Sequence, residues 1–334
     1  MLDRYAYLGP AGTFTEAALR QVVGPDSATC LPHIDVVSAI EAVREGEAEY
    51  AVVAIENSVE GGVTTVLDTL AAGSPLVILR EMLVPVSFAL AGLPSQSLDA
   101  VRRIAAHPHA WAQCRAWIHR NLPRAWHVPA SSNTAAAAAF ADALAMHDDA
   151  PHTTADSTPE VMSGIVQRLG FDAALVPPMA VAHYGLTALA EGVADNPDAV
   201  TRFVLVGPPG QTPPATGADK TTLQVHLPAE RAGALLEMLE HFATRGINLT
   251  RIESRPSGVA LGRYSFSIDA EGHIADARMA EAMIGLHRFS PLVRYMGSYP
   301  MAGGGASPLK EGTHDADFAA AHAWIDAVRR GETV

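Results

Sequence analysis

Short apolar runs, polar turns and helical patterns alternate along the first part of the chain. Tyr5–Leu8 is the first apolar run, and a Gly/Pro turn and an Ala/Leu-rich helical segment follow it. Apolar runs bounded by turn residues are typical of buried strands. The same succession begins at Tyr50–Ile55, Arg103–Ala106, Val128 and Ala173–Val176. Strands that alternate with helices predict an α/β fold with a mostly parallel, doubly wound sheet, and the length favours two such lobes with a cleft between them.

The pattern changes after residue 218. Thr221–Leu227 alternates between polar and apolar residues, as a strand does, and Gly233–Arg245 has the spacing of an amphipathic helix. We expect one face of this helix to carry Leu235, Leu236, Leu239 and Phe242. The order βαββαβ predicts a ferredoxin-like α+β domain. Its remaining predicted elements are strands at Asn248–Ser254 and Tyr264–Ala270, a helix at Asp276–His287 and a strand at Leu292–Met296.

Two segments rich in proline and glycine divide the chain. The first, Gly207–Gly217, cannot sustain a helix or a central strand, and the second is Ala302–Pro308. We therefore expect a first domain at 1–206, a linker at 207–218, a second domain at 219–300 and a tail at 301–334. In the tail, one weak helical face, to which we assign no function, comprises Phe318, Ala321, His322 and Ile325.

Composition and charge restrict the class of protein and its location. The 334 residues are 49 % hydrophobic and carry a net charge of −13, which argues against a nucleic-acid binder. The chain has neither a signal-peptide pattern nor an apolar run of about 18 residues, so we expect a cytoplasmic protein without a membrane span. The two cysteines, Cys30 and Cys114, lie outside any C-x-x-C spacing, which favours free thiols in a reducing cytosol over a disulfide.

Neutral hydrogen-bonding residues collect in the turns that follow the predicted strands. In a doubly wound sheet these turns lie at the ligand-binding edge, where helix N-termini offer free N–H groups to anions. The alternative for each residue taken singly is an ordinary helix N-cap, since caps favour the same residue types. The residues are Thr13, Asn57, Ser58, Ser131, Ser132, Asn133 and Thr134.

The motifs of several common chemistries are absent from the sequence. It contains no G-x-G-x-x-G, no Walker loop and no G-x-S-x-G, so we expect neither a nucleotide cofactor nor a serine hydrolase. Cys114 is predicted to lie within a helix, away from a nucleophile's usual place. His107 and His109 flank Pro108 without a third metal ligand at a matching spacing. We therefore predict no metal and no cofactor.

Taken together, the motifs closely resemble those of the prephenate dehydratases that carry a C-terminal ACT domain, over residues 4–300. The resemblance implies a two-lobed, periplasmic-binding-protein-like catalytic domain followed by an ACT regulatory domain. In the first domain it rests on YLGPAGTFTEAA (7–18), AIENSVEGGV (54–63), HPHAWAQCR (107–115), the turn at 131–134, VAHYGL (181–186) and VTRFVLVG (200–207). In the second it rests on GALLEMLEHFATRGINLTRIESRP (233–256) and GSYP (297–300).

The resemblance implies a reaction, the decarboxylating dehydration of prephenate to phenylpyruvate on the route to phenylalanine. The family's Thr-Arg-Phe motif corresponds to Thr201, Arg202 and Phe203. We expect Thr201 to protonate or orient the leaving hydroxyl and Arg202 to bind a substrate carboxylate, or else to hold its loop through an ion pair. Phe203 is expected at the cleft wall. The implied substrate-binding residues are Thr13, Phe14, Asn57, Ser58 and Phe203, with Ser132, Asn133 and Thr134 in an ambiguous register.

The ACT resemblance implies feedback inhibition by phenylalanine at an interface between two copies, in a homodimer or homotetramer. Gly233 begins a predicted helix whose N-terminus could receive the ligand's carboxylate, although tight packing would also explain the glycine. The implied phenylalanine site comprises Gly233, Ala234, Leu235, Asn248 and Leu249, supported by Glu253 and Ser254 of the motif Glu253-Ser-Arg-Pro256.

Three departures from the family pattern and two rival functions stand beside this interpretation. Ala54 and Ala232 each replace a proline that is usual in the family. The position two residues before Thr201, usually Asn in the family, is Ala199. Arogenate dehydratase is the enzymatic alternative, since the residues that would distinguish an amine from a ketone cannot be located from the sequence. A non-catalytic amino-acid sensor is the alternative of another class, because two-lobed domains of this kind also bind solutes. Retention of Thr201 and Arg202 argues against the sensor.

Overall fold

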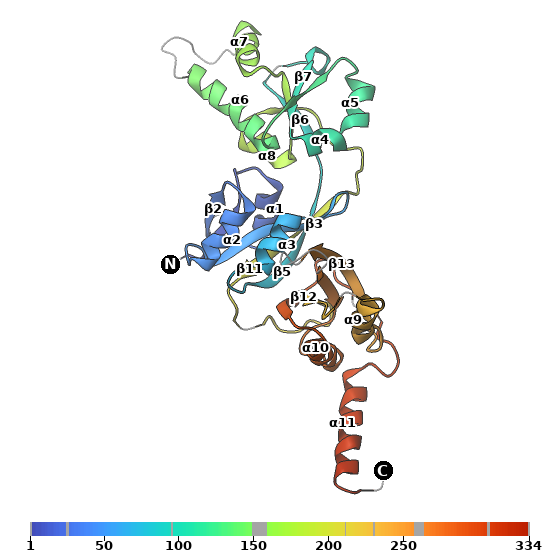
Figure 1. Cartoon of the computed structure of the whole chain (residues 1–334). Coiled ribbons are helices and arrows are strands. Elements are labelled where there is room, and N and C mark those ends of the chain that lie inside the picture. Colours follow the sequence, from blue (N-terminus) through green and yellow to red (C-terminus); the bar gives the residue numbers. More distant parts are fainter. Residues whose placement is uncertain are drawn as a thin grey trace. The chain divides into compact units, whose positions relative to one another are not determined.

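The computed structural model describes residues 2–24, 27–94, 96–148, 159–210, 212–229, 231–256, 264–305 and 308–332 (Figure 1). The chain divides into two compact units. Unit 1 comprises Met1–Ala39, Val52–Gly61 and Leu83–Phe203. Unit 2 comprises Ile40–Ala51, Gly62–Met82 and Val204–Val334. Unit 2 therefore combines the C-terminal part of the chain with two segments from the first 206 residues.

Six strands form the first sheet, and a short helix follows each of three of these strands along the chain. Its order is β2-β1-β3-β11-β5, with β4 paired to β3, and β1 and β2 run parallel. The strands are β1 (Arg4–Leu8), β2 (Thr29–His33), β3 (Tyr50–Asn57), β4 (Gly61–Gly62), β5 (Val77–Pro85) and β11 (Val200–Gly207). The helices are α1 (Phe14–Arg20), α2 (Val36–Arg44) and α3 (Thr64–Ala71).

A second sheet of five strands lies within unit 1, in the order β10-β6-β9-β7-β8. β7 runs parallel to β8 and β9, whereas β6 runs antiparallel to β9 and β10, so the sheet is mixed. The strands are β6 (Ala89–Gly92), β7 (Arg103–Ala106), β8 (Trp126–Pro129), β9 (Ala173–Val176) and β10 (Thr187–Ala190). The other elements are the 3-10 turn η1 (Leu98–Ala100), α4 (Pro108–Gln113), α5 (Arg115–Asn121), α6 (Asn133–Asp148), α7 (Pro159–Leu169) and α8 (Pro178–His183).

The prediction of a mostly parallel sheet therefore needs correction for β6 and β10. Neither segment was predicted as a strand from the sequence, and the strand direction of a four-residue run such as Ala89–Gly92 cannot be read from its apolar composition. Buried side chains pack on both faces of the five-stranded sheet, including Leu90 and Leu175 in one cluster and Ala105 and Phe140 in another. The α/β architecture with two sheets matches the two predicted lobes.

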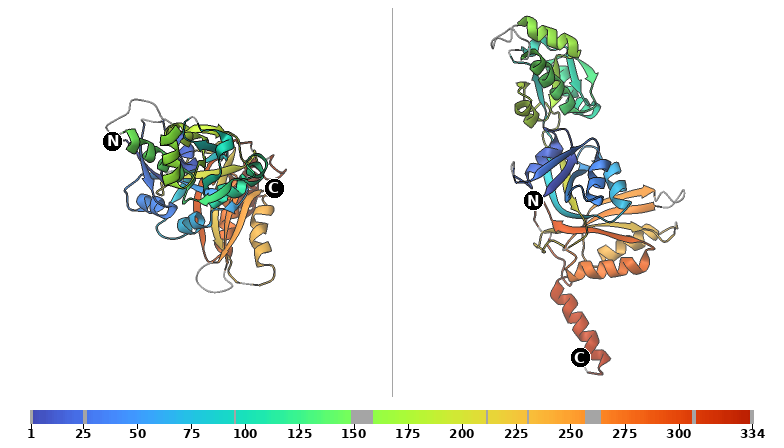
Figure 2. Two further views of the ribbon diagram at one scale, coloured as in Figure 1. Left: turned by 90° about the horizontal axis from the view of Figure 1, so that it is seen from above. Right: turned by 90° about the vertical axis from the view of Figure 1, so that its left-hand side faces the viewer.

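The C-terminal sheet confirms the predicted βαββαβ order. Its strands are antiparallel throughout, in the order β13-β14-β12-β15. Helices α9 and α10 lie on one face of this sheet (Figure 2), where Met238 and Leu286 pack against Leu223 and Ile268. The elements are β12 (Asp219–His226), α9 (Ala234–Ala243), β13 (Leu249–Pro256), β14 (Tyr264–Glu271), α10 (Ala277–Phe289) and β15 (Val293–Pro300).

The prediction of which α9 residues face the core was partly wrong. The buried residues are Ala234, Met238 and Phe242, which are spaced by four and therefore share one side of the helix. Leu235 is 40 % exposed and Leu236 is 60 % exposed. α9 thus has a second apolar surface that the sheet does not cover.

The tail forms the helix α11 (Asp315–Arg329), which is anchored to the C-terminal domain near its first turn. The Asp315 carboxylate accepts a hydrogen bond from the Ala277 N–H at 2.8 Å, at the start of α10. His322 lies 3.4 Å from Glu281, also on α10. Of the predicted face, Phe318 and Ile325 are half-buried, and Ala321 and His322 are exposed. Across the described ranges, α11 included, no helix has the length and apolar character needed to cross a membrane.

One buried carboxylate in unit 1 offers a test of the packing. Asp172, 8 % exposed, accepts hydrogen bonds from the backbone N–H groups of Arg102 and Arg103 at 2.8 and 2.7 Å. The Arg103 guanidinium also donates to it, at 2.8 Å. We predict that Asp172→Ala lowers the free energy of unfolding by about 3 kcal/mol, because it leaves a partly buried arginine without its counter-charge.

Urea unfolding followed by circular dichroism measures this change. The matched control is Asp99→Ala, which removes an exposed carboxylate from the preceding 3-10 turn and should change stability by less than about 0.5 kcal/mol. Equal effects of the two substitutions would contradict the role assigned to Asp172.

Candidate active site

The end of β3 and the start of β11 meet at residues that two different motifs contribute. The Ser58 N–H donates to the Val200 carbonyl at 2.9 Å, and the Val200 N–H donates to Ser58 Oγ at 2.9 Å. Beside them, the Asn57 amide Nδ2 donates to Thr201 Oγ1 at 2.9 Å. The structure thus brings together three of the predicted residues, Asn57, Ser58 and Thr201, although Asn57 and Thr201 are 144 positions apart in sequence.

Asn57 is held by its other amide atom. Its Oδ1 accepts hydrogen bonds from the backbone N–H groups of Val59 at 2.8 Å and Glu60 at 3.2 Å. These bonds orient the amide so that its NH₂ group points to Thr201, which is 9 % exposed. A hydroxyl both accepts and donates. Because Asn57 supplies the donor, the Thr201 O–H retains its proton to donate to a ligand.

Arg202 has the second of the two roles expected for it. Its Nη1 lies 3.2 Å from Glu56 Oε2, and the arginine side chain is only 7 % exposed, against 35 % for the glutamate. Both residues belong to the motifs that meet at Asn57 and Thr201. The guanidinium is therefore a buried positive charge paired with Glu56, and direct bidentate capture of a carboxylate would have to displace this partner.

The two predicted phenylalanines serve the core. Phe203 is 2 % exposed, so the prediction that it lines a cleft wall was wrong in this structure. Its place in the middle of a strand that is buried from Thr201 to Gly207 accounts for this. Phe14 packs edge-on against Phe88, with ring centroids 5.6 Å apart. Ala199, which replaces the family's usual Asn, is 1 % exposed and lies in an apolar cluster.

Thr13 has the N-cap role that was its alternative. Its Oγ1 accepts from the Glu16 N–H at 3.2 Å and donates to the Leu8 carbonyl at 3.3 Å. Both hydrogen-bonding capacities of the hydroxyl are thus used within the protein. The Glu16 carboxylate accepts from the Gly12 N–H rather than from the Thr13 N–H, so Thr13 and Glu16 form only half of a capping box.

The start of α6 resolves the ambiguous register at 132–134. Ser132 Oγ accepts from the Ala135 N–H at 3.0 Å, which makes Ser132 the helix cap. Asn133 Oδ1 accepts from the His107 N–H at 2.9 Å and so joins the starts of α4 and α6. Thr134 is 1 % exposed, which removes it from the candidates for ligand contact.

A further set of side-chain contacts in the site was not predicted from the sequence. His109 Nδ1 lies 2.5 Å from Glu60 Oε1, and Gln113 Nε2 lies 3.5 Å from the same oxygen. Glu60 thereby connects the loop that carries Asn57 to α4. Both turns were noted in the sequence, but 49 positions separate the two residues and no spacing rule relates them. Burial, with the neighbouring His109, lowers the pKa of His107.

The cysteines do not provide a nucleophile here. Cys114 is not within a helix as predicted but at the junction of α4 and α5. It is fully buried, and burial raises the pKa of its thiol to about 12. A neutral, buried thiol is unreactive. Cys30 and Cys114 are both free thiols, as expected.

The residues predicted to bind phenylalanine fall into two groups. Gly233, with φ of 87°, is the N-cap of α9, and Gly233, Ala234 and Leu235 line a cavity of about 490 Å³. The residues lining this cavity do not include the exposed Asn248 or the half-buried Leu249. Glu253 instead lies 3.6 Å from Arg251, and Ser254 is exposed. One chain therefore does not bring all seven residues together.

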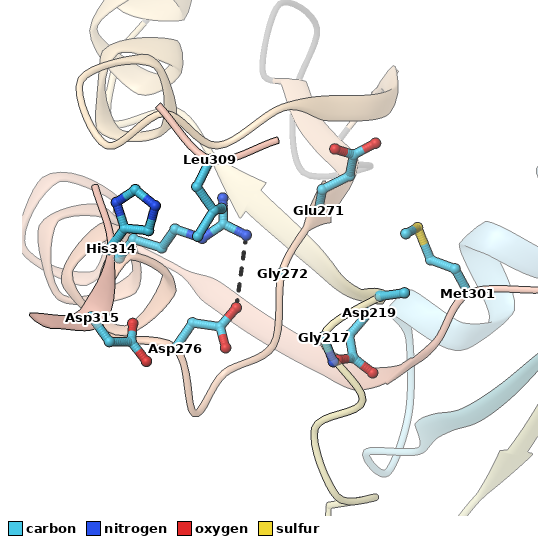
Figure 3. A pocket seen from close by; sticks show the side chains of 11 residues that line it. Gly217, Asp219, Glu271, Gly272, Asp276, Met301, Leu309, His314 and Asp315 are labelled. Atoms are coloured by element: carbon cyan, nitrogen blue, oxygen red, sulfur yellow. Dashed lines mark hydrogen bonds and ion pairs between the residues drawn. The ribbon is translucent and has the colours of Figure 1, made fainter. Parts of the chain in front are cut away.

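A second cavity, of about 340 Å³, lies where the tail meets the C-terminal domain (Figure 3). Its wall includes Asp219, Asp276, Asp315 and His314. A 3.8 Å ion pair between Asp276 and Arg278 crosses it. None of the residues predicted to bind phenylalanine lines this cavity.

Comparison with known proteins shows the family to which the chain belongs. The prephenate dehydratase family profile matches residues 5–211, and the ACT domain profile matches residues 221–287. The prephenate dehydratase of Amycolatopsis methanolica is 42 % identical over 332 residues, which are 99 % of each chain. This chain belongs to the prephenate dehydratase family.

Solved structures agree with this assignment to a family of lyases. Prephenate dehydratase from Arthrobacter aurescens, determined in complex with L-Phe, is 50 % identical, with a TM-score of 0.85 over 98 % of this chain and 99 % of that one. A structure described as GqqA, a novel type of quorum quenching acylase, has a TM-score of 0.73 and 29 % identity. It covers 90 % of this chain and 98 % of its own.

Replacing the Asn57 amide nitrogen with an oxygen tests the hydrogen bond between Asn57 and Thr201. Asn57→Asp keeps the oxygen that holds Val59 and Glu60 but removes the amide donor to Thr201. We expect kcat for prephenate to fall by about 10²-fold, because a displaced catalytic group costs about that much.

Steady-state kinetics measures the effect, and thermal unfolding confirms that the variant is folded. Asn121→Asp is the control, since the Asn121 amide also donates a hydrogen bond, in this case to the backbone carbonyl of Trp117 on an exposed helix end. An Asn57→Asp enzyme with unchanged kcat would show that the bond to Thr201 is irrelevant to turnover.

Proposed function

We propose that this protein converts prephenate to phenylpyruvate. The observation that carries the proposal is the Asn57–Thr201 hydrogen bond, at the point where the Glu-Asn-Ser and Thr-Arg-Phe motifs meet. In the reaction, the bond from the ring to its carboxylate breaks and CO₂ leaves. The electron pair enters the ring, which becomes aromatic, and the hydroxyl departs with one proton as water. Because aromatisation drives the step, the enzyme needs chiefly to hold the substrate and assist the hydroxyl.

Thr201 is the residue proposed to meet the leaving hydroxyl. The Asn57 amide donates a hydrogen bond to Thr201 Oγ1, so the Thr201 O–H is left to donate to another acceptor. An ordinary threonine is a weak acid, and its contribution is therefore orientation and hydrogen bonding of the departing oxygen. Arg202, paired with Glu56, ties the start of β11 to the end of β3 and so supports the position of Thr201. Ser58, Ser132 and Asn133 complete the proposed substrate-binding set.

Phenylalanine is the proposed regulator, bound by the ACT domain. The support is the ACT match at 221–287 and the L-Phe complex of the Arthrobacter aurescens relative. Gly233, Ala234 and Leu235 would form one wall of the site, and Asn248, Leu249, Glu253 and Ser254 of a second copy would complete it. The exposed Leu235 and Leu236 on α9 favour a homodimer or homotetramer, since burying apolar side chains stabilises an interface.

The domain division and the location are part of the same proposal. We assign catalysis to 1–206 and regulation to 219–300, joined by the linker at 207–218, with the tail at 301–334 lying outside both. A cytoplasmic location suits the two free thiols, since a reducing compartment keeps cysteines unpaired.

An assay of the purified full-length protein tests the activity. Prephenate should yield phenylpyruvate, and added phenylalanine should inhibit its formation. Arogenate provides the matched comparison, because it differs from prephenate in carrying an amine in place of the side-chain ketone. Turnover of arogenate without turnover of prephenate would replace the proposed substrate, and turnover of neither would favour a sensor.

Substitution of Thr201 tests its role directly. We predict that Thr201→Ala reduces kcat by at least about 10²-fold while KM changes little, because the lost interaction acts on the departing hydroxyl. Thr201→Ser keeps the hydroxyl and should retain most of the activity. Comparable kcat values for the alanine and wild-type enzymes would exclude Thr201 from the mechanism.

A further inference from the structure

Helix α3 is held by the ACT sheet at several points within unit 2. Arg255, on β13, binds Asp68 on α3 through two hydrogen bonds, from Nε to Oδ1 at 3.1 Å and from Nη2 to Oδ2 at 2.6 Å. Arg294, on β15, donates to the carbonyls of Ala72 and Gly73, both at 3.4 Å, at the end of α3. The helix is therefore attached to the regulatory domain near its middle and at its C-terminal end.

The segment just before α3 also touches the same strand. The Glu253 carboxylate packs so closely on Gly62 that a Cβ at this glycine would overlap it. Glu253 is in turn 3.6 Å from Arg251. Residues 253 and 255 lie on the same side of β13, as alternate residues of a strand do. One side of β13 therefore contacts both Gly62 and α3.

These contacts adjoin the candidate active site along the chain. Gly62 follows Asn57 by five positions, and β4, which contains Gly62, pairs with β3, which ends at Asn57. The turn between them is closed by Asn57 Oδ1, which accepts from Glu60 N–H. Gly62 and α3 thus follow, within a few residues along the chain, the turn that orients the Asn57 amide toward Thr201.

The proposed phenylalanine site includes residues of β13. Leu249, Glu253 and Ser254 lie on it, together with Arg255. We propose that the Asp68–Arg255 ion pair couples phenylalanine binding in the ACT domain to the turn that carries Asn57. This inference rests on the proposed function, and it names the contact through which regulation of that site passes.

The chemistry of the pair suits this role. Single-point surface ion pairs contribute little, but a two-bond arginine–carboxylate fork fixes both distance and orientation. The Arg255 side chain is 27 % exposed and the Asp68 side chain is 53 % exposed. Because both side chains reach solvent, the pair can break and form again, and a device with two states requires a contact that one state makes and the other loses.

The experiment compares phenylalanine inhibition with phenylalanine binding in the full-length enzyme. Asp68→Asn removes the charge with little change of shape, at a residue outside the proposed ligand site. We expect the phenylalanine concentration for half-inhibition to rise about tenfold, within the usual range of coupling between sites. Isothermal calorimetry should show that phenylalanine still binds to this variant. A merely structural role would lower thermal stability without separating binding from inhibition.

Two further variants sharpen the comparison. The charge-reversed double variant Asp68→Arg/Arg255→Asp should recover inhibition toward the wild-type concentration, since the pair can form again with its ends exchanged. The matched control is Arg329→Gln, which breaks the 3.2 Å ion pair with Asp326 on α11 and should leave both activity and inhibition unchanged.

The outcomes separate this inference from the proposed function. A wild-type enzyme that converts prephenate but does not respond to phenylalanine overturns the proposed regulation, and this inference with it. A wild-type enzyme that responds, with an Asp68→Asn variant inhibited at the same concentration, overturns this inference alone. Loss of calorimetric binding in Asp68→Asn would also overturn it, because the residue would then belong to the ligand site.

Discussion

The hydrogen bond between Asn57 and Thr201 is the interaction on which the candidate site depends. It closes the contact between the end of β3 and the start of β11, which Ser58 and Val200 reinforce with two further bonds. β11 is buried along all but its first residue, and β3 is buried at half of its residues. In the proposed mechanism, a hydroxyl held by Asn57 needs no reorganisation to meet a departing oxygen, which is how preorganised sites lower a barrier.

Binding a dianionic substrate in a protein of net charge −13 is a local matter. Arg202 follows Thr201 on β11, and its buried guanidinium is paired with Glu56 at 3.2 Å. The Ser132-capped start of α6 adds a helix N-terminus, where backbone N–H groups favour an anion. The overall acidic charge acts through solvent and is screened within about 10 Å at ordinary salt concentrations.

Packing in unit 2 attaches segments of the first 206 residues to the ACT domain. α3 and Gly62 contact the ACT strands through Arg255, Arg294 and Glu253. Lys220 on β12 adds a 3.0 Å ion pair with the buried Glu81 of β5. Segments from the first 206 residues therefore share their packing with the ACT domain, which is why the compact units do not divide at the linker.

The sequence alone determined the elements with strong periodicity, the βαββαβ order and the motifs that supply Asn57, Ser58, Thr201 and Arg202, because local patterns encode these. Tertiary structure decided which of these side chains meet. It buried Phe203 and Thr134. It used the Thr13 hydroxyl both as hydrogen-bond donor and as acceptor within the protein. It also joined Glu60 to His109 across 49 positions. It also exposed Leu235 and Leu236, since only the packed sheet defines which side of α9 faces the core. Burial and long-range pairing depend on the whole fold, and no local spacing in the sequence specifies them.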